Sequence, residues 1–254
     1  VPKLSLDYDS GGGVTELGIG WRLSGVPSIR RRTTDGLPRF DDTDTFELSG
    51  LGVPSELLEV APDLFRPEYE DGSFVRVQRS SDGSEWEARS KAGVTYRFGG
   101  PEHTEEEGGN VATYLLREQL DLHGHAIRYE WDTSEGHALL TSVTLNEVTE
   151  AARIQIEFTY EERPDWHVTF AAGIRQDITR RLTSVEVTRG GDLVRRYTIG
   201  YQDGVHSRLA TVDMVGTDGA TALPTVSVEY TEPSFASDGQ ITAMQAPPGR
   251  SPGE

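Results

Sequence analysis

Two histidines have the type and spacing of metal ligands. His123 and His125 flank Gly124 in the stretch DLHGHAIRYEW, and imidazole nitrogens are common ligands of zinc. A zinc site needs at least a third protein ligand, and two histidines without an evident third ligand are more often exposed turn residues. We therefore interpret both histidines as exposed turn residues and expect no bound metal.

Acidic residues form two further clusters with possible chemistry. Asp41, Asp42 and Asp44 lie in FDDTDTF and could supply oxygen ligands to calcium, but the run lacks the glycine and the distal glutamate of a calcium loop. Capping and solvation are the favoured roles, and calcium binding stays open. The run Glu105–Glu107 could supply an acid and a base, but adjacent carboxylates in a glycine-rich loop are typical of a solvated charge run.

Nucleophile and phosphate-binding motifs are absent from the sequence. The chain contains no GxSxG elbow, no GxxxxGK[ST] loop and no HExxH helix. We therefore predict that this chain is not an enzyme, and that it needs no cofactor and takes no small-molecule substrate.

Composition limits the partners and the compartment. The chain has 254 residues, no cysteine and a formal net charge of -18, so disulfides and a cysteine nucleophile are excluded. Nucleic acids and anionic membranes bind basic surfaces, and we expect neither as a partner. No apolar run approaches the ~20 residues of a membrane-spanning helix, and the first residues lack the pattern of a signal peptide. The sequence indicates a soluble protein.

Alternating apolar and polar residues must position these side chains. In ARIQIEFTYEE, one face carries Ile154, Ile156, Phe158 and Tyr160, which is typical of a half-buried antiparallel strand. The same reasoning predicts strands at 4–8, 17–23, 74–78, 94–98, 114–122, 127–131, 154–160, 182–188, 194–201 and 225–230. Helix signals are nearly absent, and the best candidate is the short run SELLEV that starts at Ser55, which is too short to carry the architecture.

Glycines mark the turns and one unusual strand. Gly190 and Gly191 separate two alternating runs, which predicts a two-residue hairpin turn. In ELGIGWRLSG, Gly18 and Gly20 leave one face of a strand without side chains. Such glycines mark bends or the close approach of another backbone, so we predict that both contact another segment and that Trp21 is buried.

The order of these motifs resembles a known family. PKLSLDYDSGGG and LGIGWRLSGVPSIRRRTTDGLPRFDDTDTFELSG contain, in order, an LSLxYxS strand, an LGxGW strand, an I-x-R segment, a GLPRF turn and a DTFxLSG strand. This order is similar to that of the SpvB-like N-terminal domain, found in Salmonella virulence protein SpvB and in the B component of insecticidal Tc toxin complexes. WEARSKAGVTYRFGG resembles a later element of that domain, and DLHGHAIRYEW resembles an RHS or YD repeat hairpin. The matching motif positions are Gly18, Gly20, Trp21, Arg30, Gly36, Pro38, Asp44, Phe46, Trp86, Tyr96, Gly99, Gly124 and Tyr129.

The resemblance implies a fold and a division of the chain. We expect an all-β protein in which antiparallel hairpins form a large curved sheet or part of an RHS-like β shell. Residues 1–232 would form the SpvB-like β domain, with a possible seam near 102–110, and residues 233–254 would be a linker or tail. The sequence departs from the family at Asp9 and Gly11–Gly13, where a YNSxxGNG pattern is usual, and both versions keep turn-forming residues.

The resemblance also implies a structural role. In SpvB the ADP-ribosyltransferase is a separate C-terminal domain, whose motif pairs an STS strand with an ExE loop. Here Glu85 and Glu87 match ExE by letters alone, and neither they nor Glu157 and Glu161 accompany such a strand. We expect a non-catalytic part of a secreted toxin or virulence protein, with a cytoplasmic location before release as the alternative, whose shell encloses or presents a toxin for delivery.

The expected partners of such a domain are other shell or propeller domains of the same toxin assembly, and this fragment itself would not contact a membrane. The alternative function is an adhesin-like or carbohydrate-binding β module. In that reading Trp86, Trp131 or Trp166 would form an exposed stacking platform.

Overall fold

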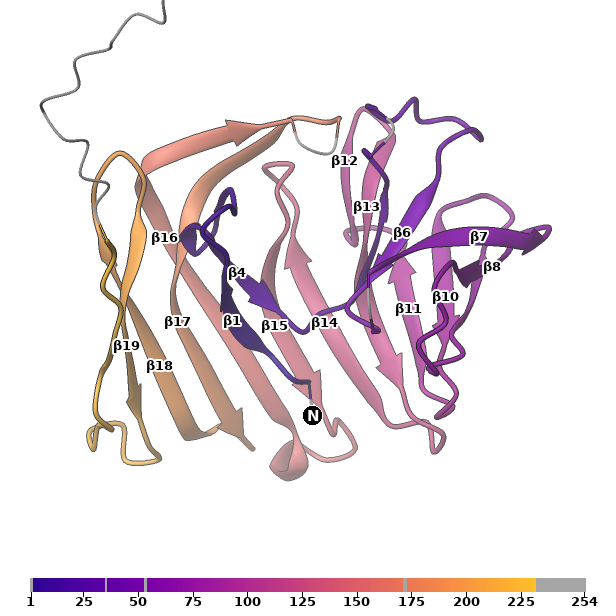
Figure 1. The fold of residues 1–254 in the computed structure, drawn as a ribbon. Coiled ribbons are helices and arrows are strands. Elements are labelled where there is room, and N and C mark those ends of the chain that lie inside the picture. The colour runs from indigo at the N-terminus through magenta and orange to yellow at the C-terminus, as the bar shows by residue number, and fades with distance from the viewer. Residues whose placement is uncertain (1, 35, 53, 171–172, 232–254) are drawn as a thin grey trace, which may run out of the picture.

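The computed structural model describes residues 2–34, 36–52, 54–170 and 173–231, and the regular secondary structure of these residues is almost entirely antiparallel strands (Figure 1). In the described residues the only helical element is one 3-10 turn, η1 (Glu150–Ala152). The all-β expectation is confirmed. The predicted linker or tail at 233–254 lies outside the described residues.

Strands from the first half of the chain close on themselves. β5 (Ser28–Arg31), β6 (Phe46–Ser49), β7 (Ser55–Ala61), β8 (Leu64–Pro67), β9 (Arg76–Arg79), β10 (Glu85–Arg89) and β11 (Thr95–Gly99) pair in sequence order. β13 (Asn110–Leu120) pairs with both β11 and β5, and β12 (Thr104–Glu107) pairs with β13. The result is a small barrel, at the right in Figure 1.

Aromatic rings fill this barrel. The ring of Trp86 lies 4.9 Å from that of Phe46, 5.0 Å from that of Phe65 and 5.9 Å from that of Tyr114, measured between centroids. All four side chains are buried because alternate positions of their strands point inward.

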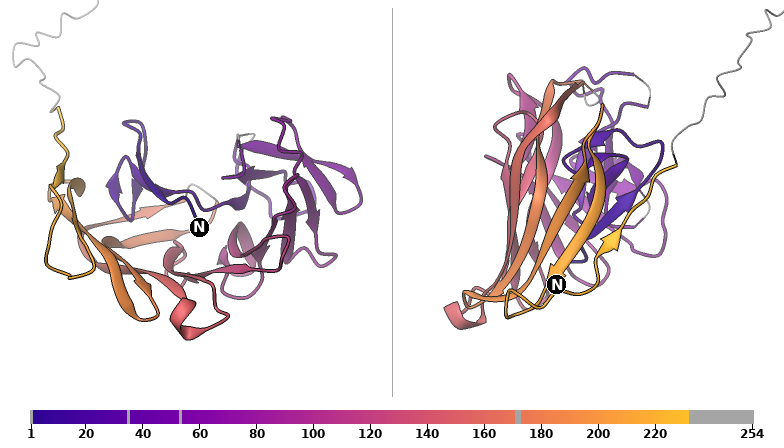
Figure 2. Two further views of the ribbon diagram at one scale, coloured as in Figure 1. Left: turned by 90° about the horizontal axis from the view of Figure 1, so that it is seen from below. Right: turned by 90° about the vertical axis from the view of Figure 1, so that its left-hand side faces the viewer.

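The second half of the chain continues the sheet as an open meander. β14 (Ala126–Asp132), β15 (Leu139–Leu145), β16 (Ile154–Thr169), β17 (Gln176–Arg189), β18 (Asp192–Gln202), β19 (Arg208–Val215) and β20 (Val226–Ser227) follow β13 in order. Figure 2 shows that barrel and meander together form a deep curve. The Gly190–Gly191 turn is confirmed: Arg189 pairs with Asp192, and both glycines have positive φ.

The first strands lie inside this curve. β1 (Ser5–Tyr8) pairs with β4 (Trp21–Ser24), and β2 (Val14–Thr15) pairs with β3 (Gly18–Ile19). We call residues 2–24 the N-terminal strap, because they lie across the concave face of the open sheet (Figures 1 and 2).

Several local predictions were wrong. SELLEV is strand β7 and not a helix, because Ser55 and Leu57 alternate inward and both neighbouring strands satisfy its backbone. The strand expected at 17–23 is broken, since Gly18 (φ 89°) and Gly20 (φ 78°) adopt backbone angles outside the β region. The strand expected from Phe74 begins at Arg76, after Phe74 itself takes a positive φ of 50°.

Candidate functional site: the concave face and the N-terminal strap

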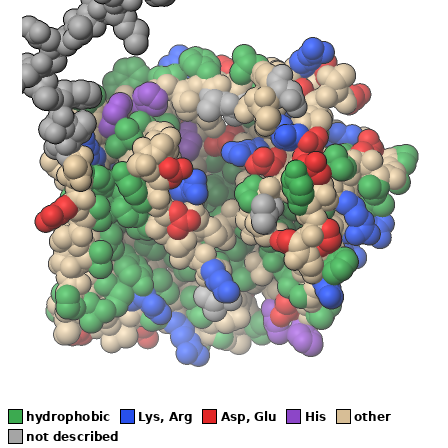
Figure 3. Space-filling model, viewed as in Figure 1, with side chains coloured by type: hydrophobic (Ala, Val, Ile, Leu, Met, Phe, Trp, Pro, Cys, Tyr) green, Lys and Arg blue, Asp and Glu red, His purple; other side chains and the backbone are tan. Residues whose placement is uncertain are grey.

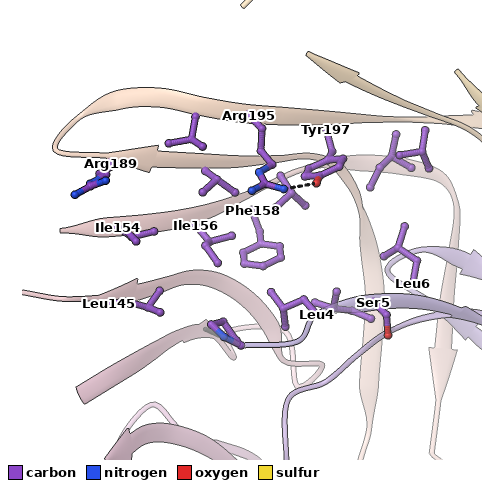
Figure 4. Close-up of a pocket in the computed structure, with 17 residues that line it drawn as sticks. Leu4, Ser5, Leu6, Leu145, Ile154, Ile156, Phe158, Arg189, Arg195 and Tyr197 are labelled. Carbon is purple, nitrogen blue, oxygen red and sulfur yellow. Dashed lines mark hydrogen bonds between the residues drawn. The ribbon is translucent and has the colours of Figure 1, made fainter. Parts of the chain in front are cut away.

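An apolar hollow opens on the concave side of the sheet. It encloses about 660 Å³ between the strap, which contributes Leu4, Leu6 and Leu23, and the floor formed by the open sheet. The floor residues come from five successive strands: Leu145, Ile154, Ile156, Phe158, Val185, Val187, Val194, Tyr197, Ile199 and Val212. Hydrophobic side chains gather on this face in Figure 3, and Figure 4 shows several of them pointing into the hollow.

Strand alternation explains why this face is apolar. Along β16, Ile156 and Phe158 are buried while Glu157 and Thr159 are exposed on the other side of the sheet. The lining also includes Arg189 and Arg195, and Arg195 Nη1 donates to Tyr197 Oη at 3.4 Å (Figure 4). Such a surface offers burial to apolar groups and has little that could activate a nucleophile.

Backbone hydrogen bonds attach the strap to the sheet. The Leu182 amide donates to the Glu16 carbonyl at 2.8 Å, and the Ile19 amide donates to the Ser207 carbonyl at 3.0 Å. Leu17 lies between Glu16 and Ile19 in the strap and has no exposed surface. The strap is therefore attached to the sheet by main-chain hydrogen bonds and by the burial of Leu17.

The glycines of the strap permit this contact. A Cβ on Gly18 would lie 2.3 Å from the Ser207 carbonyl oxygen, and a Cβ on Gly20 would lie 2.8 Å from both the Asp9 carbonyl oxygen and the Tyr8 ring. The predicted close approach at both glycines is confirmed. Trp21, expected to be buried, is only partly buried: its ring packs 5.2 Å from the ring of Tyr8, itself half exposed.

A buried ion pair lies beneath the strap. The register of β16 breaks between Glu162 and His167, and within this bulge Arg163 turns inward and binds both carboxylate oxygens of Asp165 at 3.0 and 2.9 Å. Arg163 Nη1 also donates to the Thr15 carbonyl at 2.7 Å. Ser207 donates to Asp165 through its amide and its hydroxyl, at 2.5 and 2.6 Å.

The electrostatics of this pair follow from its partners. Burial alone would raise the pKa of Asp165, but the hydrogen bonds from Arg163 and Ser207 outweigh burial and hold that pKa well below its usual range. The carboxylate therefore stays charged and joins β16, the loop before β19 and, through Arg163, the strap. The sequence showed no signal for this pair, because its members face inward only in the bulge.

A second buried cluster surrounds His137, in the loop between β14 and β15. Its Nε2 lies 3.4 Å from Glu16 Oε2 in the strap, and its Nδ1 lies 3.7 Å from Glu105 Oε1 in β12. Glu105 also accepts a hydrogen bond from the Ala138 amide at 2.9 Å. The expectation that Glu105–Glu107 is a solvated run is wrong for Glu105, which is buried, while Glu106 and Glu107 are exposed.

The other chemical candidates lie away from the concave face and are occupied locally. His123 and His125 are exposed in the β13–β14 turn, and His125 Nδ1 lies 2.8 Å from Asp121 Oδ2. The hydrogen bond with His125 lowers the pKa of Asp121 to about 2. Within the described parts of the chain, no three His, Asp or Glu side chains gather as a metal site.

The aspartates of FDDTDTF organise their own loop. Asp41 accepts hydrogen bonds from the amide and hydroxyl of Thr43, at 2.9 and 2.6 Å, and these lower its pKa. Asp44 accepts from Arg31 Nη1 and from the Phe40 amide, both at 2.7 Å. Asp42 is exposed. The arrangement caps the loop and fixes it to β5.

The glutamates that match ExE by letters form ion pairs on β10. Glu85 binds Arg117 through both oxygens, at 2.7 and 2.8 Å. Glu87 Oε1 accepts from Arg89 Nε at 2.9 Å. The Glu85–Arg117 pair joins β10 to β13, the Glu87–Arg89 pair lies within β10, and Glu87 Oε2 also accepts from Arg97 Nε of β11 at 3.3 Å. Glu157 and Glu161 are exposed on β16.

The remaining motif positions support strands and turns of the barrel and of the β13–β14 hairpin. Gly99 is buried, and a Cβ there would lie 2.5 Å from the Ser84 carbonyl oxygen. Burial raises the pKa of Tyr129 to about 12. Arg30 pairs with Glu47, and Gly36 and Pro38 line a small hollow beside Asp44. Phe46 and Trp86 belong to the barrel core, and Tyr96 is half-buried. Gly124 has a positive φ in its turn. No described helix has the length and apolar character needed to cross a membrane.

Sequence comparisons place the chain among known proteins. Mono(ADP-ribosyl)transferase SpvB of Salmonella typhimurium is 44% identical over 57 residues, which are 22% of this chain and 9% of that protein. The corresponding protein of Salmonella choleraesuis is 42% identical over 57 residues. The chain matches only a small part of these relatives, so their enzymatic activity is not transferred to it.

Structural comparisons show a shared fold. The N-terminal domain of effector protein SpvB from Salmonella typhimurium superposes with a TM-score of 0.72 at 19% identity, covering 85% of this chain and 94% of that chain. A chain of the TcdB2-TccC3 crystal structure superposes with a TM-score of 0.72 at 21% identity, covering 92% of this chain and 16% of that chain.

The family follows from the sequence match, which covers more than half of the chain. A family model described as Salmonella virulence plasmid 65kDa B protein matches residues 1–166, which include the strap, the barrel and most of β16. The chain therefore belongs to the SpvB family.

Proposed function

We propose that this chain is a non-catalytic wall segment of a secreted toxin or virulence protein, with its concave face turned toward an enclosed interior. The observation that carries the proposal is the apolar hollow of about 660 Å³ in an open, curved sheet. A contiguous apolar surface that opens to solvent and is rimmed by polar residues is typical of a contact site. A wall that encloses or presents a toxin uses such a surface on its inner side.

The comparisons support this role by analogy. The chain shares its fold with about one sixth of the TcdB2-TccC3 chain, for which the coverage is 16%, and a segment of that size needs neighbours to complete a shell. The proposed partners are the other shell or propeller domains of the same assembly. Release from the producing cell belongs to the proposal.

The absence of a catalytic role rests on how the polar groups are used. Within the described residues, the buried charged groups at the concave face are Arg163, Asp165, His137, Glu16 and Glu105, and each contacts another member of these clusters. Their contacts join the strap, β12 and β16, which supports a role in holding layers of the core together. We infer that they act in folding.

The alternative function, a carbohydrate-binding module, needs exposed tryptophan rings, and two of its three candidate rings are not exposed. Trp86 is buried at 1% exposure, and Trp131 is partly buried, with its indole donating to the Leu116 carbonyl at 2.9 Å. Trp166 is exposed, but a stacking platform of the expected kind needs several coplanar rings.

Cryo-electron microscopy of the complete protein that carries this chain tests the proposal. We expect the hollow between β1 and the β15–β19 floor to face an interior space closed by other domains. A concave face open to bulk solvent in the complete protein would contradict the wall role. Turnover of NAD by the purified chain would contradict the non-catalytic part.

A matched pair of variants on β17 adds a functional test. Val187 lines the hollow, whereas Thr188 is the next residue of the same strand and points to the opposite face. In the complete protein we expect Val187→Glu to reduce protease protection of enclosed polypeptide and Thr188→Glu to leave it unchanged. Equal effects of the two variants on protease protection would show that the concave face has no special role in enclosing polypeptide.

A further inference from the structure

His137 lies between two buried carboxylates that belong to different layers of the domain. Glu16 comes from the N-terminal strap and Glu105 from β12, and they approach opposite nitrogens of the imidazole, at 3.4 and 3.7 Å. The side chains of His137, Glu16 and Glu105 are only 18%, 14% and 12% exposed. The imidazole thus bridges the strap to the sheet.

Other charged groups facing this cluster are already engaged. Arg163, from β16, faces His137, but its guanidinium binds both oxygens of Asp165. Tyr160 from β16 and Tyr201 from β18 face Glu16, and their hydroxyls donate to the Leu140 and Leu182 carbonyls, each at 2.7 Å. Burial raises the pKa of both tyrosines, so they stay neutral.

We propose that the N-terminal strap is a pH-sensitive cover of the concave face, fastened by His137 in its imidazolium form and released as the pH rises and the imidazole loses its proton. With His137 charged, Glu16 and Glu105 each face a cation. When His137 is neutral, the partly desolvated carboxylates of Glu16 and Glu105 have lost the positive charge between them. Their mutual repulsion and the cost of desolvation then favour exposure of Glu16 to water.

The direction of the pKa shifts agrees with this geometry. Burial would lower the pKa of His137, but the hydrogen bond and charge of Glu16 and the charge of Glu105 outweigh burial and raise it, with Arg163 opposing. Burial would raise the pKa of Glu16, but the hydrogen bond and charge of His137, together with backbone hydrogen bonds at Glu16 and Leu23, outweigh burial and lower it. A raised histidine pKa stabilises the closed strap below the ordinary value near 6.5, and this contribution is lost as the pH rises through the raised pKa.

Release would uncover the floor of the hollow. Leu4, Leu6 and Leu23 of the strap line it opposite Ile156 and Phe158. The backbone bonds at Ile19 and Leu182 and the bond from Arg163 to the Thr15 carbonyl do not titrate in this range. Loss of the His137 proton therefore lowers the free energy of opening, and the strap opens more often, as one unit in which these bonds break together. The inference concerns this domain alone and holds whether or not the wall role is correct.

Amide hydrogen exchange of the whole chain across pH 6 to 9 tests the proposal. The Ile19 and Leu182 amides bridge strap and sheet, and the amides of β9 and β10 in the barrel serve as internal reference. After correction for intrinsic exchange, we expect protection of Ile19 and Leu182 to fall by up to about tenfold per pH unit between the open-state and closed-state histidine pKa values, since one proton is released on opening. The reference amides should stay constant.

Two histidine variants separate the cluster from general effects of pH. His137→Gln should abolish the pH dependence at Ile19 and Leu182, whereas His125→Gln, in an exposed turn, should keep the wild-type profile. If wild-type strap protection follows the barrel amides across the series, the proposal is wrong, even if His137→Gln does not fold. A retained pH slope in folded His137→Gln would equally overturn it.

Discussion

The indole nitrogen of Trp21 donates a hydrogen bond to the phenolic oxygen of Tyr230 at 2.7 Å and so joins two residues that are 209 positions apart. Tyr230 in turn donates to the Leu209 carbonyl at 2.6 Å, and its ring lies 6.0 Å from that of Tyr8. The beginning of the described chain is therefore bound to its end across the open edge of the sheet.

Removing the Tyr230 hydroxyl should loosen this junction. Tyr230→Phe keeps the ring and deletes both hydrogen bonds, so we expect a loss of about 1 to 2 kcal/mol in the free energy of unfolding. Chemical denaturation measures it. Tyr69→Phe, at a tyrosine that is 66% exposed, is the control and should change stability by no more than a few tenths of a kcal/mol. Equal effects would show that the junction adds nothing.

A side chain at Gly18 should separate the strap from the sheet. Gly18→Ala brings a Cβ to within 2.3 Å of the Ser207 carbonyl oxygen, and we expect it to cost on the order of 2 to 4 kcal/mol through overpacking and backbone strain. Gly191→Ala is a matched control, because Gly191 has the same φ of 89° and open space around it. Thermal unfolding of both variants separates the cost of the contact with Ser207 from the cost of the positive φ. If the two variants have the same melting temperature, the close approach to Ser207 does not affect stability.

Breaking the buried ion pair should destabilise the domain strongly. Arg163→Met leaves the Asp165 carboxylate buried without its cation, and we expect a loss of about 3 to 5 kcal/mol. Urea denaturation gives the value. Arg30→Met, in an exposed pair with Glu47, should cost less than about 1 kcal/mol. Adding Asp165→Asn to Arg163→Met should recover part of the loss, and a further loss of stability in the double variant would contradict this account.

Acid should destabilise the domain through several turn aspartates. Hydrogen bonds, from Ser80 to Asp82, His125 to Asp121, Ser134 to Asp132 and Thr221 to Asp218, lower the pKa of these carboxyls from 3.8 to about 2. Their contribution is present above the ordinary pKa and is lost as the pH falls through about 2. We expect the melting temperature to fall between pH 4 and pH 2. Replacing all four by asparagine should flatten this fall, and an unchanged slope would locate the acid sensitivity elsewhere.

Local patterns in the sequence predicted much of the open sheet. The alternation in β16 and the Gly190–Gly191 turn depend on neighbouring residues only, because strand alternation and turn geometry are properties of a few successive dihedral angles. SELLEV shows the limit of this reasoning. A serine before an apolar run is typical of a helix start. The segment is a strand because it pairs with β6 and β8, which lie outside the short window that the pattern covers.

The candidate site depended much more on tertiary structure. Gly18 and Gly20 predicted that another segment of the chain approaches the strap closely, and the order of the motifs indicated the SpvB family. Nothing in the local sequence indicated that Glu105 would be buried, that His137 would meet Glu16, or that the bulge in β16 would turn Arg163 inward. Each of these contacts joins segments far apart in the chain.

The sequence by itself determined that the chain is all-β, where many of its strands lie and which glycines admit another backbone. Only the tertiary structure decided that β13 closes the barrel against β5 and β11, and that the strap covers one end of an apolar floor. The physical reason is the range of the interactions. Alternation specifies that a strand has an apolar face, but the burial energy of that face is the same against many partners, and the close fit of distant backbones and buried charges selects among them.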